Sequence, residues 1–182
     1  MALKITVDKP EFNLREKLTR LDTEKIPYEK MPVGSVIQVQ QHHLYGSGQV
    51  QTTSSTFQDS GLFIDFHPKF ANSRLLVTCA FNAQSGNASN SGIRWTIFRN
   101  INEAATSSSV NILGNSSSNM TISYHSQSGY IHEGTSLTIE DKPKTIRKVQ
   151  YRLFFRSHNS STSVGVARDW GGAHFTVMEV RE

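Results

Sequence analysis

The stretch Leu75-Leu-Val-Thr-Cys-Ala-Phe-Asn82 decides the fold of this chain. Its large apolar side chains recur at every second position, which is the pattern of a β-strand with one face in a core. Val149-Gln-Tyr-Arg-Leu-Phe-Phe-Arg156 repeats the pattern with basic residues on the opposite face. Both stretches therefore predict strands that cover a common core.

The same alternation continues through most of the chain after residue 32, and no helical period follows residue 25. Breaks rich in Ser, Asn and Gly separate the runs. Further strands are predicted at 36–40, 62–67, 93–98, 120–124, 137–139 and 174–180. Eight or more short strands at this spacing predict an all-β fold, an antiparallel β-sandwich or jelly-roll-like domain over residues 33–182.

Charge divides the chain at Pro32. Among 182 residues, 19 are Lys or Arg and 15 are Asp or Glu, so the net charge is +4. Residues 1–32 hold 7 of the basic and 6 of the acidic side chains. A compositional change of this size predicts a boundary between an N-terminal arm, residues 1–32, and the β domain. The small net charge predicts no specific binding to nucleic acid.

The arm is predicted to contain one short helix. Asn13 and Glu16 have the spacing of a capping box, while Pro27 and Pro32 prevent a helix beyond about residue 25. About ten helical residues are marginal alone in water, so the arm should become ordered only when docked. We expect it to dock on another chain, and packing on its own domain is the alternative. The expected docking residues are apolar or aromatic: Phe12, Leu14, Leu18, Leu21 and Tyr28.

Several kinds of site lack support in the sequence. Cys79 is the single cysteine, which excludes an intrachain disulfide and a cysteine-based zinc site. His42 and His43 are neighbours on a predicted strand and should point to opposite faces, so they cannot share one metal ion within a chain. We therefore expect no metal and no cofactor. No apolar run is long enough for a signal peptide or a membrane span, which predicts synthesis in the cytoplasm without membrane insertion.

Two loops are the candidates for contact with a ligand. In the first, Trp170 stands between the charged pair Arg168 and Asp169 and two glycines, an arrangement that can present a flat apolar face and hydrogen bonds to a sugar. The second contains Tyr130 and His132. For both, the simpler interpretation, which the sequence favours, is an aromatic residue that anchors a loop.

Paired carboxylates are the usual apparatus of sugar cleavage. Glu140 and Asp141 are adjacent in sequence, whereas Asp59, Asp65 and Asp169 are isolated. Nothing in the sequence places any two of them together in space, and no nucleophile, phosphate-loop or metalloprotease motif is present. We therefore predict no catalytic residues and expect these carboxylates to be solvated.

The densest basic stretch places Lys148, Arg152 and Arg156 on one face of a strand. Contact with nucleic acid or with an acidic neighbouring subunit is one interpretation. A solvated sheet face is the one we favour, because Tyr151, Leu153 and Phe155 point to the other face and so do not interleave with the basic residues.

Several strands carry large apolar residues on their second face as well. Phe63, Phe98, Phe154 and Met178 are the examples. A monomeric sandwich usually has a polar outer face, so this surplus predicts a subunit interface. Our hypothesis is a homotrimer.

Two stretches resemble a known group of proteins. Lys9-Pro-Glu-Phe-Asn-Leu-Arg-Glu-Lys-Leu-Thr-Arg-Leu-Asp22 and Ile26-Pro-Tyr-Glu-Lys-Met-Pro-Val-Gly-Ser-Val-Ile-Gln-Val39 resemble the N-terminal portion of virion structural proteins of tailed phages. Asp59-Ser-Gly-Leu62 and Pro68-Lys-Phe-Ala-Asn-Ser-Arg-Leu-Leu-Val77 resemble fibre-type β domains of phages. The resemblance departs at Ile139-Glu-Asp-Lys-Pro143, where a landmark of that group is changed.

The resemblance implies a non-enzymatic virion component made in the host cytoplasm, whose arm docks on other virion proteins. As a tail or side fibre, its distal loops would contact a host-surface glycan. A capsid decoration or cement protein is the alternative, and a polysaccharide-cleaving tail component is a second one. Several weak contacts on one particle suffice for attachment to a host, because multivalency raises the effective affinity.

Overall fold

Period-two alternation is realised as strands in the computed structural model of the chain, which describes residues 27–44, 49–86, 91–114, 121–125, 131–160, 162–167 and 172–182. The described elements are η2 (Tyr28–Lys30), β1 (Val36–Leu44), β2 (Gln49–Thr52), β3 (Gln58–Phe66), β4 (Arg74–Ser85), β5 (Ser91–Ile101), β6 (Val110–Asn111), β7 (Thr121–His125), β8 (Ile131–Asp141), β9 (Val149–Ser157), β10 (Val164–Ala167) and β11 (Ala173–Val180). No α-helix occurs among these residues.

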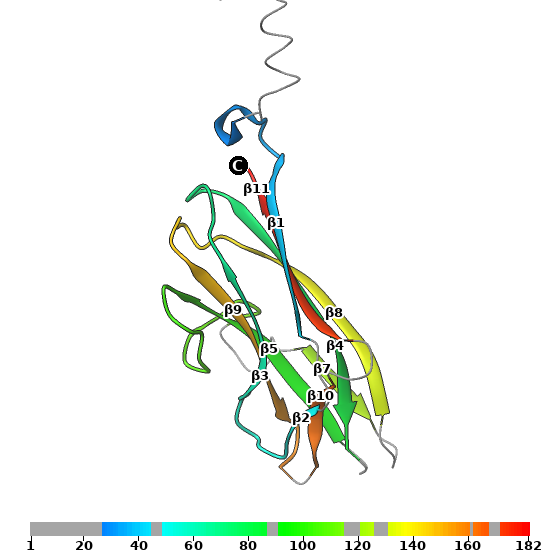
Figure 1. Ribbon diagram of the computed structural model, residues 1–182. Helices are drawn as coiled ribbons and strands as arrows, with labels where there is room; N and C mark the ends of the chain where they lie inside the picture. Colours follow the sequence, from blue (N-terminus) through cyan, green and yellow to red (C-terminus); the bar gives the residue numbers. More distant parts are fainter. Residues whose placement is uncertain are drawn as a thin grey trace, which may run out of the picture. The chain divides into compact units, whose positions relative to one another are not determined.

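The strands form two antiparallel sheets (Figure 1). Sheet A has the order β1-β11-β4-β10-β2, and β8 pairs with the other edge of β4. Sheet B has the order β3-β9-β5-β6, and β7 pairs with β5. Without the short strands β2, β6 and β10, the orders are β1-β11-β4-β8 and β3-β9-β5-β7, which is the arrangement of a jelly roll. The all-β class and the antiparallel sandwich are therefore confirmed.

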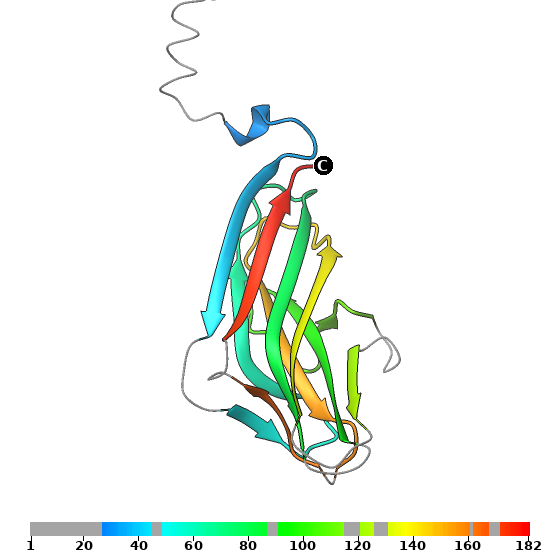
Figure 2. The ribbon, with the colours of Figure 1, turned by 90° about the vertical axis from the view of Figure 1, so that its right-hand side faces the viewer.

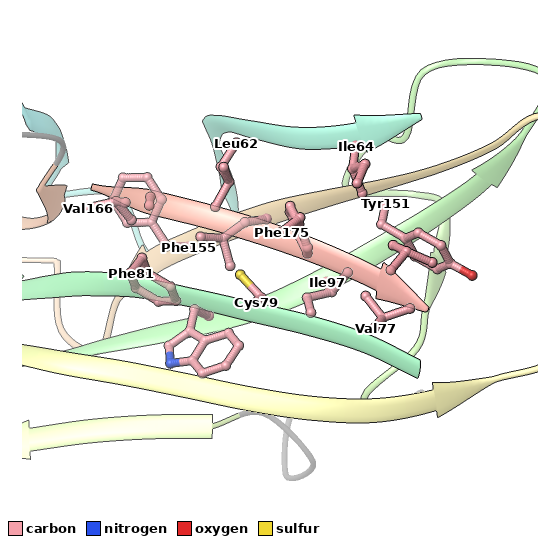
Figure 3. Packing of buried hydrophobic residues seen from close by; sticks show 14 of the residues in the cluster. Leu62, Ile64, Val77, Cys79, Phe81, Ile97, Tyr151, Phe155, Val166 and Phe175 are labelled. Carbon is pink, nitrogen blue, oxygen red and sulfur yellow. The ribbon is translucent and has the colours of Figure 1, made fainter. Parts of the chain in front are cut away.

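The core lies between the sheets and is built from the faces that the alternation predicted. Val77, Cys79, Phe155 and Phe175 are fully buried in it, as is Trp95. Figure 3 shows the Cys79 sulfur among the apolar side chains of both sheets. Burial raises the pKa of this thiol far above its usual range, so Cys79 is a packing residue rather than a nucleophile.

Glutamine side chains of β1 close one side of the sandwich. Gln38 Nε2 donates to the backbone carbonyl of His67 at 2.7 Å, and Gln40 Nε2 donates to that of Asp65 at 2.9 Å. The Asp65 carbonyl belongs to β3 and that of His67 directly follows it, at an edge of sheet B that has no strand partner on that side in the described structure. The glutamine amides thus bind backbone carbonyls that would otherwise be open to pairing with a strand of another chain.

A bulge in β3 depends on a glycine. The register with β9 shifts between Asp59 and Phe63, and Gly61 within the bulge has φ +75°. This region of backbone space favours glycine. The Asp59 carboxylate accepts a hydrogen bond from the Gly61 amide at 2.8 Å and fixes the turn. The Asp59-Ser-Gly61 stretch therefore has a local structural role.

The chain divides into two compact units, Met1–Pro32 and Val33–Glu182. The predicted helix and the docking residues Phe12, Leu14, Leu18 and Leu21 lie outside the described residues. Tyr28 is described: it opens the short 3-10 helix η2 and is 42% exposed. Within the described residues, no helix is long and apolar enough to span a membrane.

Candidate functional site

Four long strands present an open, nearly uncharged surface on the outer side of sheet A. In Figure 2, β1, β11, β4 and β8 lie side by side. The strand registers place their outward residues in rows: Val39, Met178, Leu76 and Glu140, then Gln41, Thr176, Thr78 and Thr138, then His43, His174, Ala80 and Ser136. We call these residues, with Asn82 and Gly134, the sheet A face. Glu140 is the one acidic residue of the sheet A face, and the face contains no Lys or Arg.

A hollow of about 240 Å³ opens in this surface. Ala80 and Asn82 of β4, Gly134 and Ser136 of β8, and His174 of β11 line it with Phe81, Thr135 and Gly172. It exists because outward positions on β4 and β8 carry little or no side chain, while His174 and Asn82 rise beside them. The His174 imidazole, the Asn82 amide and the Ser136 hydroxyl can exchange hydrogen bonds with a ligand there.

Charged side chains border the end of the sheet A face that lies near the C-terminus. Arg74 contacts Glu140 at 3.4 Å and Glu182 at 3.6 Å. Lys142 contacts the same two carboxylates, and its hydrogen bond with Glu182 raises the pKa of its ammonium group. All four side chains are well exposed, so the network contributes little to stability and mainly marks a polar rim.

The structure places one predicted ligand-contact residue beside the hollow. His132 is exposed on β8, two positions from Gly134, and pairs in register with Gln84. Tyr130, Arg168, Asp169 and Trp170 lie outside the described residues. The hollow itself was not predicted. The outward run Gly134, Ser136 and Thr138 already shows its small side chains, but only strand pairing reveals that Ala80 lies next to them.

The two neighbouring histidines separate as predicted. His42 stacks on Phe63, with ring centroids 5.4 Å apart, whereas His43 faces His174 on the other side of the sheet, also at 5.4 Å. Among the described residues, no group of three or more His, Cys, Asp or Glu side chains is placed to hold a metal ion.

The adjacent carboxylates Glu140 and Asp141 point to opposite sides of β8. Asp141 enters the sandwich, where Arg99 Nη1 donates to it at 2.7 and 2.9 Å and the Tyr151 hydroxyl at 2.7 Å. Burial and the nearby Asp141 charge raise the pKa of Tyr151 well above its usual range. The expectation that Asp141 is solvated is therefore wrong.

Asp59 and Asp65 are also held in structural contacts. Asp59 pairs with Arg152, while Asp65 accepts from Gln150 Nε2 at 2.8 Å. Together with the separation of Glu140 and Asp141, this leaves none of these four carboxylates paired with another in an acid–base arrangement. Asp169 lies outside the described residues.

Arg152 and Arg156 of β9, with Lys148 just before the strand, share the outer face of sheet B, as predicted. Lys148 lies 3.9 Å from Asp65, and Arg152 pairs with Asp59 and covers the Phe63 ring at 4.7 Å. Two of the three cations are thus neutralised within the chain, which weakens the case for a basic strip that tracks a nucleic acid.

Three of the four outward apolar residues are covered by the chain itself. Phe98 and Phe154 form a second small core with Phe57 and Ala105 on the outer side of sheet B. Phe63 lies under His42 and Arg152. These three residues therefore do not support the subunit interface that we expected from them. Met178 remains outward, on the sheet A face.

Comparisons with known proteins give distant likenesses. No family model and no curated protein matches the sequence. The Eiger TNF of S. frugiperda is similar at 8% identity and a TM-score of 0.44, over 79% of this chain and 93% of that one. Infectious bursal disease virus, Gx strain, is similar at 8% identity and a TM-score of 0.39, over 79% of this chain and 40% of that one. The VP2 subviral particle of the same virus gives 8% and 0.37, over 78% and 37%.

This chain thus spans about two fifths of the length of those viral chains. At these scores the likenesses carry no functional argument, and the fold rests on the strand pairing described above.

Proposed function

We propose that this chain is a non-enzymatic structural protein of a phage virion, a tail or side-fibre component. In this proposal, residues 1–32 dock on other virion proteins and the β-sandwich faces the host surface. The observation that supports it is that the β domain, residues 33–182, has two different ends. The Gly34 amide donates to the Arg181 carbonyl at 2.8 Å, so the first strand begins where the chain ends. His132 and the hollow lie toward the opposite end of β8.

Two different ends suit attachment, because a β domain that is bound at one end leaves its other end free to reach outward. Locating the protein in a reconstruction of the virion that contains it tests the proposal. Density at the tail is the expected result. Density on the capsid would instead favour the decoration alternative, and its absence from purified particles would refute both placements.

Substitutions in the arm should separate docking from folding. We expect Leu18→Asp in the full chain to reduce incorporation into particles at least tenfold, because it places a charge on the predicted Leu14, Leu18 and Leu21 stripe. Lys17→Asp, beside that stripe, is the matched control and should be incorporated normally. Quantitative immunoblots of purified particles measure both, and equal incorporation would contradict the docking role.

We further propose that the sheet A face mediates a homotrimer through its rows at Val39 and Gln41, which do not line the hollow. Its central rows lack Lys and Arg, and Val39 is 52% exposed. In a ring of three copies, one part of this surface contacts a different part of the next copy. A nearly uncharged surface allows that contact without like-charge repulsion, unlike the basic outer side of sheet B.

Thr176→Arg should convert the proposed trimer to monomer, because it places a desolvated charge at the centre of the sheet A face. Ser107→Arg, in an exposed loop that follows β5, is the control and should leave the trimer intact. Sedimentation velocity distinguishes the two masses. A wild-type monomer, or a Thr176→Arg trimer, would refute this interface.

The contact with a host-surface glycan is proposed for Tyr130, His132, Arg168, Asp169 and Trp170. We expect Trp170→Ala and His132→Ala to weaken adsorption of the labelled protein to host cells. Unchanged adsorption of both variants would exclude these residues from the contact.

A further inference from the structure

Arg156 of β9 faces another arginine instead of a carboxylate. Arg156 and Arg94 are direct partners in the antiparallel register of β9 and β5. Side chains at directly opposed positions share a face with Cβ atoms about 5 Å apart, and like charges there destabilise a sheet. Arg99 and Arg152, in contrast, each have a carboxylate partner.

Described neighbours hold Arg156 in place, and none of them neutralises either arginine. Arg156 Nη1 donates to the Ser55 carbonyl at 2.8 Å, and the guanidinium lies 5.3 Å from the centre of the Phe57 ring. Within the described part of the chain, Arg94 has no hydrogen-bond or ion-pair partner. The Nε atoms of both residues are buried and lack an acceptor. Burial, and then the charge of Arg94, lowers the pKa of Arg156.

We propose that Arg94 and Arg156 form a binding site for an oxyanion, a phosphate, sulfate or carboxylate group. Planar guanidinium groups match these anions with paired N–H donors, and a doubly charged phosphate neutralises both cations. The bound anion changes a repulsive pair into an attractive triad. Arg156 is positioned for this by Ser55 and Phe57, and Arg94 brings N–H groups that none of the described residues accepts.

The test is binding of inorganic phosphate to the full chain, measured by calorimetry and by thermal unfolding against sodium chloride of equal ionic strength. We expect phosphate to raise the unfolding midpoint and chloride not to. Arg94→Gln and Arg156→Gln should each weaken phosphate binding at least fivefold. Arg147→Gln removes the same charge just before β9, in an exposed position, and should bind like the wild type.

A second measurement separates a site from ordinary surface charge. Without phosphate, Arg94→Gln should be at least as stable as the wild type, because it relieves the repulsion of Arg156. Glucose 1-phosphate, bound as tightly as inorganic phosphate, would show that the site accepts the group on a sugar; much weaker binding would restrict the site to the free ion. Absence of binding, equal effects of chloride, or binding that survives both substitutions would overturn the proposal.

Discussion

Asp141→Ala is expected to lower the free energy of unfolding by about 3–5 kcal/mol, since it leaves the Arg99 guanidinium as an unpaired charge within the sandwich. The Arg99 side chain is only 16% exposed, and Tyr151, the second donor, is fully buried. Asp141 also connects β8 of sheet A to β5 and β9 of sheet B. Urea unfolding followed by tryptophan fluorescence measures the change. Glu140→Ala, the neighbouring but exposed carboxylate, should stay within about 0.5 kcal/mol of the wild type.

Tyr151→Phe is the companion variant, because it removes one donor and keeps the Arg99–Asp141 pair. We expect a loss of about 1 kcal/mol at neutral pH. The raised pKa of Tyr151 means that the protonated phenol stabilises the fold. This contribution is complete below the usual tyrosine pKa of 10.0 and declines as the pH rises toward the higher folded value.

Above about pH 10 the wild type should therefore lose stability more steeply than Tyr151→Phe. Equal slopes, or a stability of Asp141→Ala close to that of the wild type, would contradict the buried network.

Glu179→Ala should cost about 3 kcal/mol, because Glu179 is fully buried and accepts hydrogen bonds from four groups. Its carboxylate receives the backbone amides of Lys69 and Phe70 at 2.9–3.0 Å. Ser73 Oγ and Gln38 Nε2 each donate at 2.7 Å. The side chain thus ties the loop after β3 to the end of sheet A.

Glu179→Gln keeps the size of the side chain but turns its NH₂ group toward other donors, so we expect a smaller loss, of about 1–2 kcal/mol. Glu182→Gln removes the same charge at an exposed position and serves as the control. Hydrogen exchange of the Lys69 and Phe70 amides should accelerate in Glu179→Ala. Unchanged exchange and unchanged stability would show that the carboxylate is dispensable.

The inner faces of the strands were predictable from the sequence, because burial of every second residue leaves a direct trace in the pattern. Alternation placed Phe175, Val177 and Glu179 on one face, and all three are buried. The short strand β10 was missed. It contributes four residues, too few for a periodic signal, and its pairing with β2 and β4 comes from distant parts of the chain.

The candidate site was predictable only in fragments. The tendency of β8 to carry small outward residues can be seen in Gly134 and Ser136, yet the hollow needs Ala80 and His174 from two other strands. The separation of Glu140 from Asp141 follows from strand geometry. That Asp141 meets Arg99 and Tyr151, however, depends on how the two sheets stack.

By itself, the sequence determined the all-β class, the inward and outward residues of most strands, and a change of composition at Pro32, since these properties depend on local order along the chain. Only the tertiary structure decided which outward residues stay exposed. Phe98 is covered by Phe57, which lies 41 positions earlier, while Met178 is half-buried on the sheet A face. The tertiary structure also places Arg94 directly opposite Arg156, because pairing between strands far apart in sequence is set by the packing of the whole sandwich.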